Sequence, residues 1–371
     1  MHKTKIRTVI CTFLILFASI SAGCGNTAGI PSAESYVDEA NLSGTTATAG
    51  DDIPTEKEVS PLQIPSSPSL PAAGTGASSA AGSEKASSAS ASSGVSVPEV
   101  PDDGKDYIEI LFLGDSQFAS GRGTDTDIPT IVRDYVQIVD DADCFVYNLG
   151  VADSATTIQS EEKELSPENW SSVSLLSMAH LLNGDGSLSA LEHASPEAAA
   201  VYRTIRPEKI DYIVIEYGIH DYLNGTTAVD KNDDRTLSIF SNAYKASLFL
   251  LRNAFPQATI LCCTPCFAQL FGPDGAFLGT GGSLDNGSGN LGTYVGLIDY
   301  WYRQFDRTLY VDMYNGQRMD LDSYTADEYL ADGILLTPEG RRAFGAAVAQ
   351  VINKDRGAVT EEYQLIEIDA L

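Results

Sequence analysis

The chain contains the stretch Ile108-Glu109-Ile110-Leu111-Phe112-Leu113-Gly114-Asp115-Ser116-Gln117, in which an apolar run ends abruptly in glycine and polar residues. The run is short and rich in isoleucine and leucine, which is typical of a β-strand buried on both faces. Glycine followed by small polar residues is typical of a turn. The stretch therefore predicts a central strand whose carboxyl end carries Asp115 and Ser116.

Four further apolar runs of the same kind follow along the chain, and turn residues bound each of them. They are 144–149, 212–217, 259–263 and 309–311. Helix-like segments lie between the runs, and the clearest are 236–255, 294–305 and 338–351. Strands that alternate with helices predict an α/β fold with a parallel, doubly wound sheet.

Polar clusters follow three of the predicted strands. They are Gly114-Asp115-Ser116, then Gly150, then Gly218-Ile219-His220-Asp221. Ligands of open α/β sheets bind outside the carboxyl ends of the strands, so we expect these three clusters to converge on one site.

Two connections exceed the ordinary length between elements, namely 161–209 and the glycine-rich 272–292. They either frame or cover the expected site, or they are loops with no special role.

The N-terminus has the pattern of a secretory signal peptide, which we assign to residues 1–23. Basic residues precede an apolar run at 9–20, and the segment ends in Ser21-Ala22-Gly23-Cys24. This end resembles a lipobox, the cleavage site of bacterial lipoproteins, so we expect Cys24 to be acylated and the protein to be anchored outside the bacterial cell membrane. The alternative is an ordinary secretory signal in which the cysteine is incidental.

Composition divides the rest of the chain in two. Residues 24–104 are dominated by Ser, Ala, Gly and Pro and offer no core, so we expect a disordered linker after the lipidated cysteine. Residues 105–371 are enough for one α/β domain. The chain has a formal net charge of −28, which argues against nucleic acid as a partner and is typical of a soluble acidic surface.

Four cysteines lie in the predicted domain, namely Cys144, Cys262, Cys263 and Cys266. The last two have the CxxC spacing of redox and metal sites, but no second CxxC accompanies them. Cysteines in an apolar strand behave as small hydrophobic residues, so we favour buried thiols over a disulfide or a metal site. We expect neither a metal nor a cofactor.

Four segments resemble, in order, the sequence blocks of the SGNH (GDSL-like) hydrolase family. They are Leu113-Gly114-Asp115-Ser116-Gln117, Asn148-Leu149-Gly150, Gly218-Ile219-His220-Asp221, and Asp332-Gly333-Ile334-Leu335-Leu336-Thr337-Pro338-Glu339-Gly340. The resemblance covers residues 107–353. It implies a flavodoxin-like three-layer sandwich with a five-stranded parallel sheet, and the activity of a serine esterase or acylhydrolase.

The resemblance also implies roles for single residues. Ser116 would be the nucleophile, Asp332 the carboxylate that orients the base, and the N–H groups of Ser116 and Gly150 would form the oxyanion hole. Two positions depart from the family, because His220 replaces its oxyanion-hole asparagine and Leu335 replaces its catalytic histidine. A serine hydroxyl needs a base that takes its proton, so the triad is incomplete as it stands.

Another histidine can replace the missing base only if it lies beside the serine. His220 is the candidate, either as the base or as a third oxyanion donor, but one imidazole cannot readily do both from one place. A purely structural role is the third option. His180 and His193 lie in the first long connection, where a lone histidine is more often structural or exposed.

Three hypotheses about function follow. In the first, the protein is a surface hydrolase of small-molecule or glycan esters that deacetylates envelope or external glycans. In the alternative, it is a catalytically inactive SGNH domain that serves as a ligand-binding module at the cell surface. In the third, Leu335 is an individual substitution in an otherwise active line.

Overall fold

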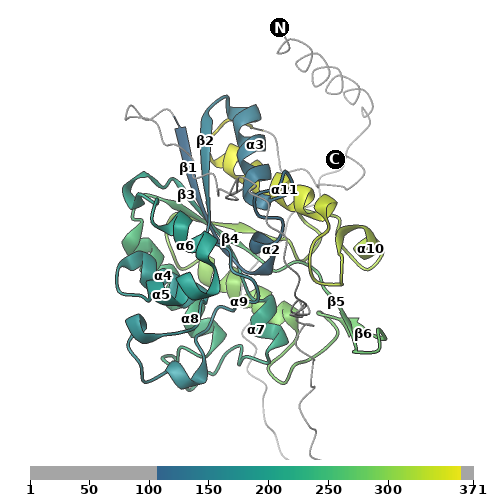
Figure 1. Cartoon of the computed structure of the whole chain (residues 1–371). Helices are drawn as coiled ribbons and strands as arrows, with labels where there is room; N and C mark the ends of the chain where they lie inside the picture. The colour runs from purple at the N-terminus through teal and green to yellow at the C-terminus, as the bar shows by residue number, and fades with distance from the viewer. Residues whose placement is uncertain (1–106, 361–371) are drawn as a thin grey trace, which may run out of the picture. The chain divides into compact units, whose positions relative to one another are not determined.

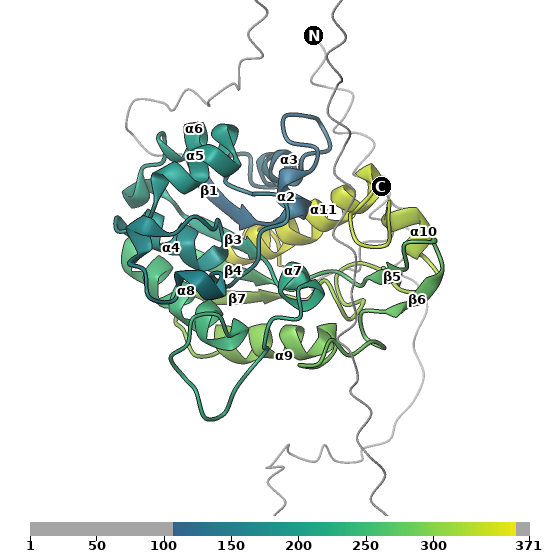
Figure 2. The ribbon, with the colours of Figure 1, turned by 60° about the horizontal axis from the view of Figure 1, so that its bottom comes forward.

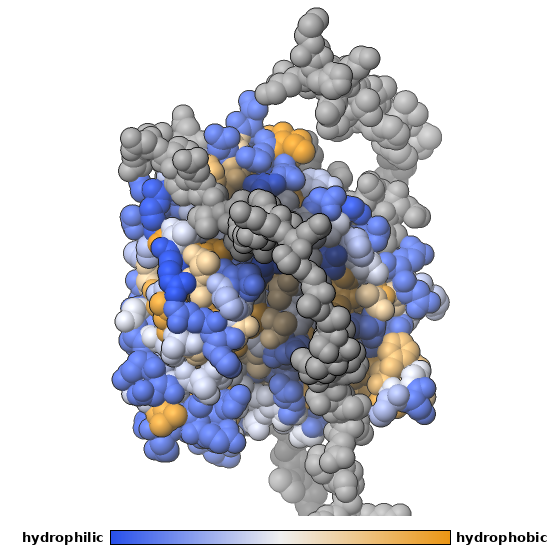
Figure 3. All heavy atoms as spheres, viewed as in Figure 1, coloured by the Kyte–Doolittle hydropathy of each residue, from blue (hydrophilic) through white to orange (hydrophobic). Residues whose placement is uncertain are grey.

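The computed structural model describes residues 107–360. The predicted signal peptide, the predicted lipidation site Cys24 and the predicted linker up to residue 104 lie outside the described residues. Within the described part, no helix is both long enough and apolar enough to cross a membrane. Hydrophilic side chains cover most of the described surface that faces the viewer in Figure 3.

Five parallel strands form the central sheet, as predicted. Their order across the sheet is β2-β1-β3-β4-β7, which is the flavodoxin-like order. The strands are β1 (Tyr107–Gly114), β2 (Asp143–Asn148), β3 (Tyr212–Glu216), β4 (Thr259–Cys263) and β7 (Thr308–Val311). All eight residues of β1 are buried, because this strand lies between β2 and β3 and is covered on both faces.

Side chains of β1 point alternately to the two faces of the sheet. Ile110 and Phe112 pack against α3 (Ile128–Asp140) and α11 (Pro338–Asp355). Leu111 and Leu113 belong to the opposite layer, which contains α4 (Leu175–Asn183), α8 (Phe240–Ala254) and α9 (Leu291–Tyr302). Figures 1 and 2 show these helices on the two sides of the sheet, so the predicted three-layer sandwich is confirmed.

Shorter elements complete the domain. Helices α2 (Ser116–Ala119) and α7 (Ile219–Leu223) follow β1 and β3 directly. The first long connection forms α4, α5 (Leu188–Ala194) and α6 (Pro196–Tyr202), with 3-10 turns at Ser160–Glu162, Pro167–Asn169 and Pro207–Lys209. The second follows β5 (Gln269–Phe271) and includes β6 (Phe277–Thr280), and these two strands form a hairpin on the side of the domain that also carries α10 (Ala326–Tyr329).

Two helices begin elsewhere than predicted. Helix α8 starts at Phe240 rather than at Thr236, because Oδ1 of Asp233 accepts hydrogen bonds from the N–H groups of Arg235 and Thr236 and holds a turn there. Helix α9 starts at Leu291, because the Asn290 side chain caps it.

The four cysteines of the domain are buried and free, so the prediction of buried thiols is confirmed. Burial raises the pKa of the Cys262 thiol to about 12. Among residues 107–360, no group of three or more His, Cys, Asp or Glu side chains is arranged to hold a metal ion.

Candidate active site

Ser116 is the first residue of α2, and only Asp115 separates it from the end of the central strand. The Asp115 carboxylate caps this helix, because its Oδ1 accepts a hydrogen bond of 3.0 Å from the N–H of Gln117. Gly114 allows α2 to fold back over the strand end, since a Cβ there would lie 2.4 Å from the ring of Phe118. The turn therefore presents the Ser116 hydroxyl at the carboxyl edge of the sheet, as the sequence predicted.

Gly150 has a packing role that the sequence analysis did not anticipate. A Cβ at this residue would lie 2.6 Å from Cβ of Phe118 and 2.8 Å from its carbonyl carbon, so only glycine lets the β2 loop pass against α2. The Gly150 N–H donates a hydrogen bond of 2.8 Å to Oδ1 of Asn148. The N–H that we expected in an oxyanion hole therefore already has a partner in this structure, and its role there stays a prediction.

The N–H that does face the serine belongs to Asp153. It donates a hydrogen bond of 2.8 Å to Oγ of Ser116. Asp153 has a φ of 58°, in the left-handed region that aspartate tolerates better than most residues, and this conformation turns the N–H toward the serine. Sequence reasoning missed Asp153, because a single aspartate in a loop carries no distinctive signal.

His220 lies beside the serine, as predicted. Its Nε2 is 3.3 Å from Oγ of Ser116, which is hydrogen-bond distance. Gly218 starts the turn into α7 with a φ of 124°, a conformation that glycine adopts without strain. The side chain of His220 is 14% exposed, and Ser116 is buried.

The buried Asp221 carboxylate joins α7 to the loop that follows β2. Its Oδ2 accepts a hydrogen bond of 2.7 Å from the N–H of Thr156, and its Oδ1 accepts one of 3.3 Å from Oγ1 of Thr157. Burial raises the pKa of Asp221 to about 6, although these hydrogen bonds oppose the shift. The carboxylate therefore holds together the two segments that carry His220 and Asp153.

Gln117, the residue that follows the serine, fixes the loop that carries Leu335. The Gln117 side-chain N–H donates to the carbonyl of Ile334 at 2.9 Å, and its Oε1 accepts from the N–H of Leu336 at 3.2 Å. Leu335 lies between these two anchored residues. The loop thus keeps an ordered position although it lacks the family's histidine.

Asp332 is not joined to His220. It is exposed, and its Oδ1 accepts hydrogen bonds from the N–H groups of Ile334 at 3.0 Å and Leu335 at 2.8 Å. The carboxylate thus shapes its own loop, and the structure contains no contact between it and the imidazole. Asp332 therefore does not orient His220, whose place in the resemblance is that of the oxyanion-hole asparagine.

Two buried carboxyl groups lie at the strand ends next to the serine. Glu216 is the last residue of β3 and pairs in register with Gly114, which places it beside Asp115. Burial, together with the neighbouring Asp115, raises the pKa of Glu216 well above its ordinary value. Burial raises the pKa of Asp115 as well, and the nearby His220, whose Nε2 lies 3.9 Å from Oδ2 of Asp115, opposes this shift.

The other two histidines have structural surroundings. His180 stacks edge-on against Trp170, and its Nδ1 lies 3.1 Å from the Asp185 carboxylate. His193 is exposed on α5.

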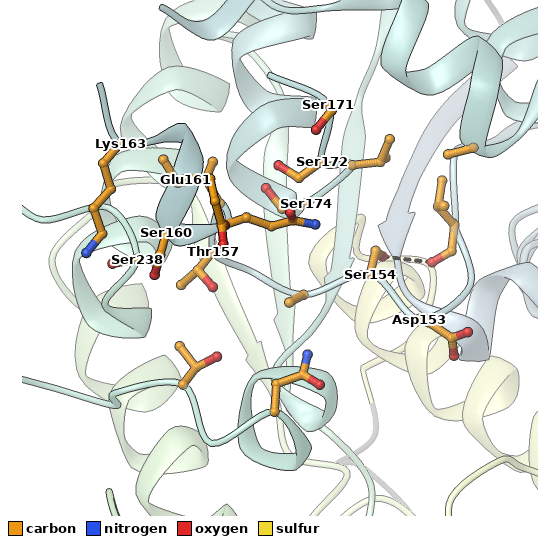
Figure 4. Close-up of a pocket in the computed structure, with 18 of the residues that line it drawn as sticks. Asp153, Ser154, Thr157, Ser160, Glu161, Lys163, Ser171, Ser172, Ser174 and Ser238 are labelled. Carbon is orange, nitrogen blue, oxygen red and sulfur yellow. Dashed lines mark hydrogen bonds between the residues drawn. The ribbon is translucent and has the colours of Figure 1, made fainter. Parts of the chain in front are cut away.

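A polar cavity of about 850 Å³ opens from Asp153 into the first long connection. Figure 4 shows Asp153 at one end and Lys163 with Ser238 at the other. Five of its neutral polar side chains form no hydrogen bond with another described residue: Ser160, Asn224, Thr226, Thr227 and Ser238. The first long connection therefore does frame the site.

The fold and this site define a class: a flavodoxin-like α/β domain with a serine and a histidine paired at the carboxyl edge of its sheet. No protein-family model and no curated protein matches the chain.

Several solved structures do match it, with low sequence identity. A possible lipase from Chitinophaga pinensis is 13% identical, with 68% of this chain and 100% of that chain covered and a TM-score of 0.43. A family two carbohydrate esterase from Clostridium thermocellum, solved with cellohexaose, is 14% identical, with 68% and 65% covered and a TM-score of 0.40. An acetyl xylan esterase is 12% identical, with 66% and 100% covered and a TM-score of 0.41.

Proposed function

We propose that the protein is a serine hydrolase of esters in which Ser116 and His220 act as a catalytic dyad. The observation that carries this proposal is the distance of 3.3 Å between Oγ of Ser116 and Nε2 of His220. A nucleophile and a base within hydrogen-bond reach of each other are the minimum for acyl transfer through a serine. No cofactor is needed for this chemistry.

In the first half-reaction, Oγ of Ser116 attacks the ester carbonyl, and His220 takes the hydroxyl proton. The bond from the carbonyl carbon to the alcohol oxygen breaks, and His220 returns the proton to that oxygen. In the second half-reaction, water attacks the acyl-serine, gives a proton to His220, and the bond to Oγ breaks as this proton passes to Oγ.

The negative oxygen that forms during attack needs hydrogen-bond donors. We assign this role to the N–H of Asp153 and, as the family resemblance implies, to the N–H of Ser116. The Asp153 N–H already points at Oγ of Ser116. Such fixed donors are worth about 10²–10³ in rate each.

The dyad lacks the strong orienting carboxylate of a complete triad. The nearest buried carboxyl group is Asp115, and its Oδ2 lies 3.9 Å from Nε2 of His220, beyond a hydrogen bond. Nε2 of His220, which faces the serine, is also the ring nitrogen nearest to Asp115 and Asp153. The other nitrogen, Nδ1, has no carboxylate partner within the described residues. We therefore expect slow turnover.

The polar cavity supports a polyhydroxylated alcohol as the leaving group, such as an acetylated glycan. Its unengaged hydroxyl and amide side chains can replace the hydrogen bonds that sugar hydroxyls make with water. An alkyl alcohol would leave these groups without partners. This reasoning favours glycan esters over lipid esters.

We also propose that the protein works outside the cell, held to the bacterial cell membrane by the acylated Cys24. The support is the N-terminal sequence, with its basic start, apolar run and small residues before the cysteine. Radiolabelled palmitate in growing cells tests this anchor. A Cys24→Ser chain that still incorporates the label would contradict it.

Turnover of 4-nitrophenyl acetate by the purified domain tests the reaction. We expect slow turnover that Ser116→Ala abolishes and His220→Ala reduces to the same residual rate, because a nucleophile and its base act as a unit. His193→Ala, which changes an exposed histidine outside the site, is the control. Turnover that survives Ser116→Ala would overturn the proposal.

A second candidate is a ligand-binding module without catalysis. The observation that favours it is Asp332, whose carboxylate is engaged in its own loop instead of orienting a base. Calorimetric titration with acetylated xylo-oligosaccharides separates the two candidates. Binding without turnover, in both the native protein and Ser116→Ala, would support the module.

A further inference from the structure

The side chain of Asp153 lies at the mouth of the polar cavity, beside the nucleophile. Its Oδ1 accepts a hydrogen bond of 3.2 Å from Oγ of Ser116 and lies 3.9 Å from Nε2 of His220. The side chain is 74% exposed, so it is open to a ligand. Within residues 107–360, His220 is the only basic group at ion-pair distance from this carboxylate.

Other charges around the serine do not neutralise Asp153. Asp115 is a buried carboxyl group, and burial raises its pKa. The guanidinium of Arg122 is directed at the carbonyls of Asn148 and Gly150, and Lys163 lies at the opposite end of the cavity. Asp153 is therefore the exposed charged group that lies next to the nucleophile.

A negative charge at this place opposes the chemistry of a neutral ester in two ways. Attack by Ser116 creates a negative oxygen close to the Asp153 carboxylate, and two like charges a few ångströms apart repel each other. In addition, Oδ1 of Asp153 and Nε2 of His220 compete for one hydroxyl proton. Both effects disappear if the ligand itself brings a positive charge to Asp153.

We propose that the site takes esters whose acyl group carries an α-ammonium, that is, aminoacyl esters of a polyhydroxylated alcohol. This inference rests on the proposed function and names its acyl group. The α-ammonium of an acyl group attached to Oγ is only a few bonds from that oxygen. A carboxylate at 3.2 Å from Oγ is therefore within ion-pair reach of it.

Pairing with the ammonium withdraws the Asp153 carboxylate from the Ser116 hydroxyl. The hydroxyl proton is then free to pass to His220, while the ammonium keeps its own protons and the Asp153 N–H remains directed at the reacting atoms. The cationic substrate thus removes the competitor and balances the charge of the negative oxygen. The specificity of the site and its activation come from the same contact.

The test compares turnover of 4-nitrophenyl alaninate with turnover of 4-nitrophenyl propionate, which lacks the α-ammonium. Each enzymatic rate is divided by the rate of uncatalysed hydrolysis of the same ester. We expect the full chain to prefer the alaninate by about tenfold or more. Asp153→Asn keeps the backbone N–H and tolerates the left-handed conformation. It should abolish the preference and raise propionate turnover several-fold.

Asp125→Asn is the matched control, because it removes one exposed carboxylate outside the cavity. It should leave the preference intact. High salt should weaken the preference of the native chain, since an exposed ion pair is screened. A native chain without preference, or one whose preference survives Asp153→Asn, would overturn the inference while the ester hydrolase stands.

Binding decides the inference if neither ester is turned over. The Ser116→Ala chain is titrated with alaninamide and with propionamide, and alaninamide should bind about tenfold more tightly. Addition of Asp153→Asn should remove the difference. Tighter binding of alaninamide without turnover of either ester would support the aminoacyl ligand and reject the hydrolase. Equal binding of the two amides would reject the aminoacyl ligand.

Discussion

Oγ of Ser116 and Nε2 of His220 lie 3.3 Å apart, although the two residues are separated by 104 positions in the chain. The contact arises because β1 and β3 are neighbours in the sheet and each ends in a turn at the same edge. The contact supplies two of the three members of a serine triad, because the carboxylate of Asp332 accepts hydrogen bonds from its own loop instead.

Restoring the family's base should increase activity. In Leu335→His, we expect the loop anchored by Gln117 to bring the new imidazole to the serine, with Oδ2 of Asp332 available to orient it. We expect ester turnover to rise by about 10²–10⁴, and more when His220→Asn adds an oxyanion donor. Steady-state kinetics with 4-nitrophenyl acetate measure the gain.

Leu335→Ala is the control, because it opens the same space without adding a base. No gain in the double variant, despite a folded domain, would mean that the loop does not present residue 335 to the serine. A native rate as high as that of the double variant would mean that His220 is already a complete base.

The hydrogen bonds of the Gln117 side chain should contribute measurably to the free energy of unfolding. Gln117→Ala leaves the carbonyl of Ile334 and the N–H of Leu336 without their partner in a buried setting, at a cost of about 1–3 kcal/mol in the free energy of unfolding. Urea denaturation measures it. Gln304→Ala, at an exposed residue, should cost almost nothing, and an equal loss in both variants would contradict this account.

Gly150→Ala should destabilise the domain by about 1–3 kcal/mol, because the added Cβ overlaps α2 at Phe118. The displaced helix carries Ser116, so turnover should fall too. Gly296→Ala is a contrasting control inside α9, where nothing lies within 4 Å of the new Cβ. It should stabilise the helix by up to about 1 kcal/mol. Thermal unfolding of both variants decides the point.

Asp221 should make stability depend on pH. Its pKa is about 6 in the folded protein and about 4 in the unfolded chain, so the folded state binds the proton more tightly. The corresponding stability is present below pH 4 and is lost as the pH rises through 6, by about 3 kcal/mol. Urea midpoints at pH 4, 5, 6 and 7 follow this loss.

Asp221→Asn should remove this part of the pH dependence. A second part should remain, because burial also raises the pKa of Asp127 to about 6. An unchanged loss of stability between pH 4 and pH 6 in Asp221→Asn would show that the carboxyl group does not bind a proton in the folded state.

The strands could be predicted from the sequence because their pattern is local. Burial on both faces makes each strand a continuous apolar run, so the predicted bounds of β4, 259–263, are those observed. Helix starts depend on single side chains that compete for backbone groups. The Asp233 turn, which delays α8, is one such case.

The candidate site also contains residues that the local sequence predicts and residues whose roles depend on packing. Ser116 and His220 were predicted, because strand ends mark where polar residues converge. The exchange of Gly150 for Asp153 as the donor toward the serine was not, because it depends on how closely the β2 loop passes Phe118. That distance is a property of packing between segments remote in sequence.

Strand β1 is buried along its whole length, and it ends two residues before the nucleophile. Amide protons in such a strand exchange with solvent only when the whole domain opens, whereas loops at a cavity mouth open in smaller steps. The anchor of Ser116 should therefore belong to the slowest-exchanging part of the molecule. Substitutions in the loops at the cavity mouth, including at Asp153, can then change ligand selection without changing the stability of the strand that positions Ser116.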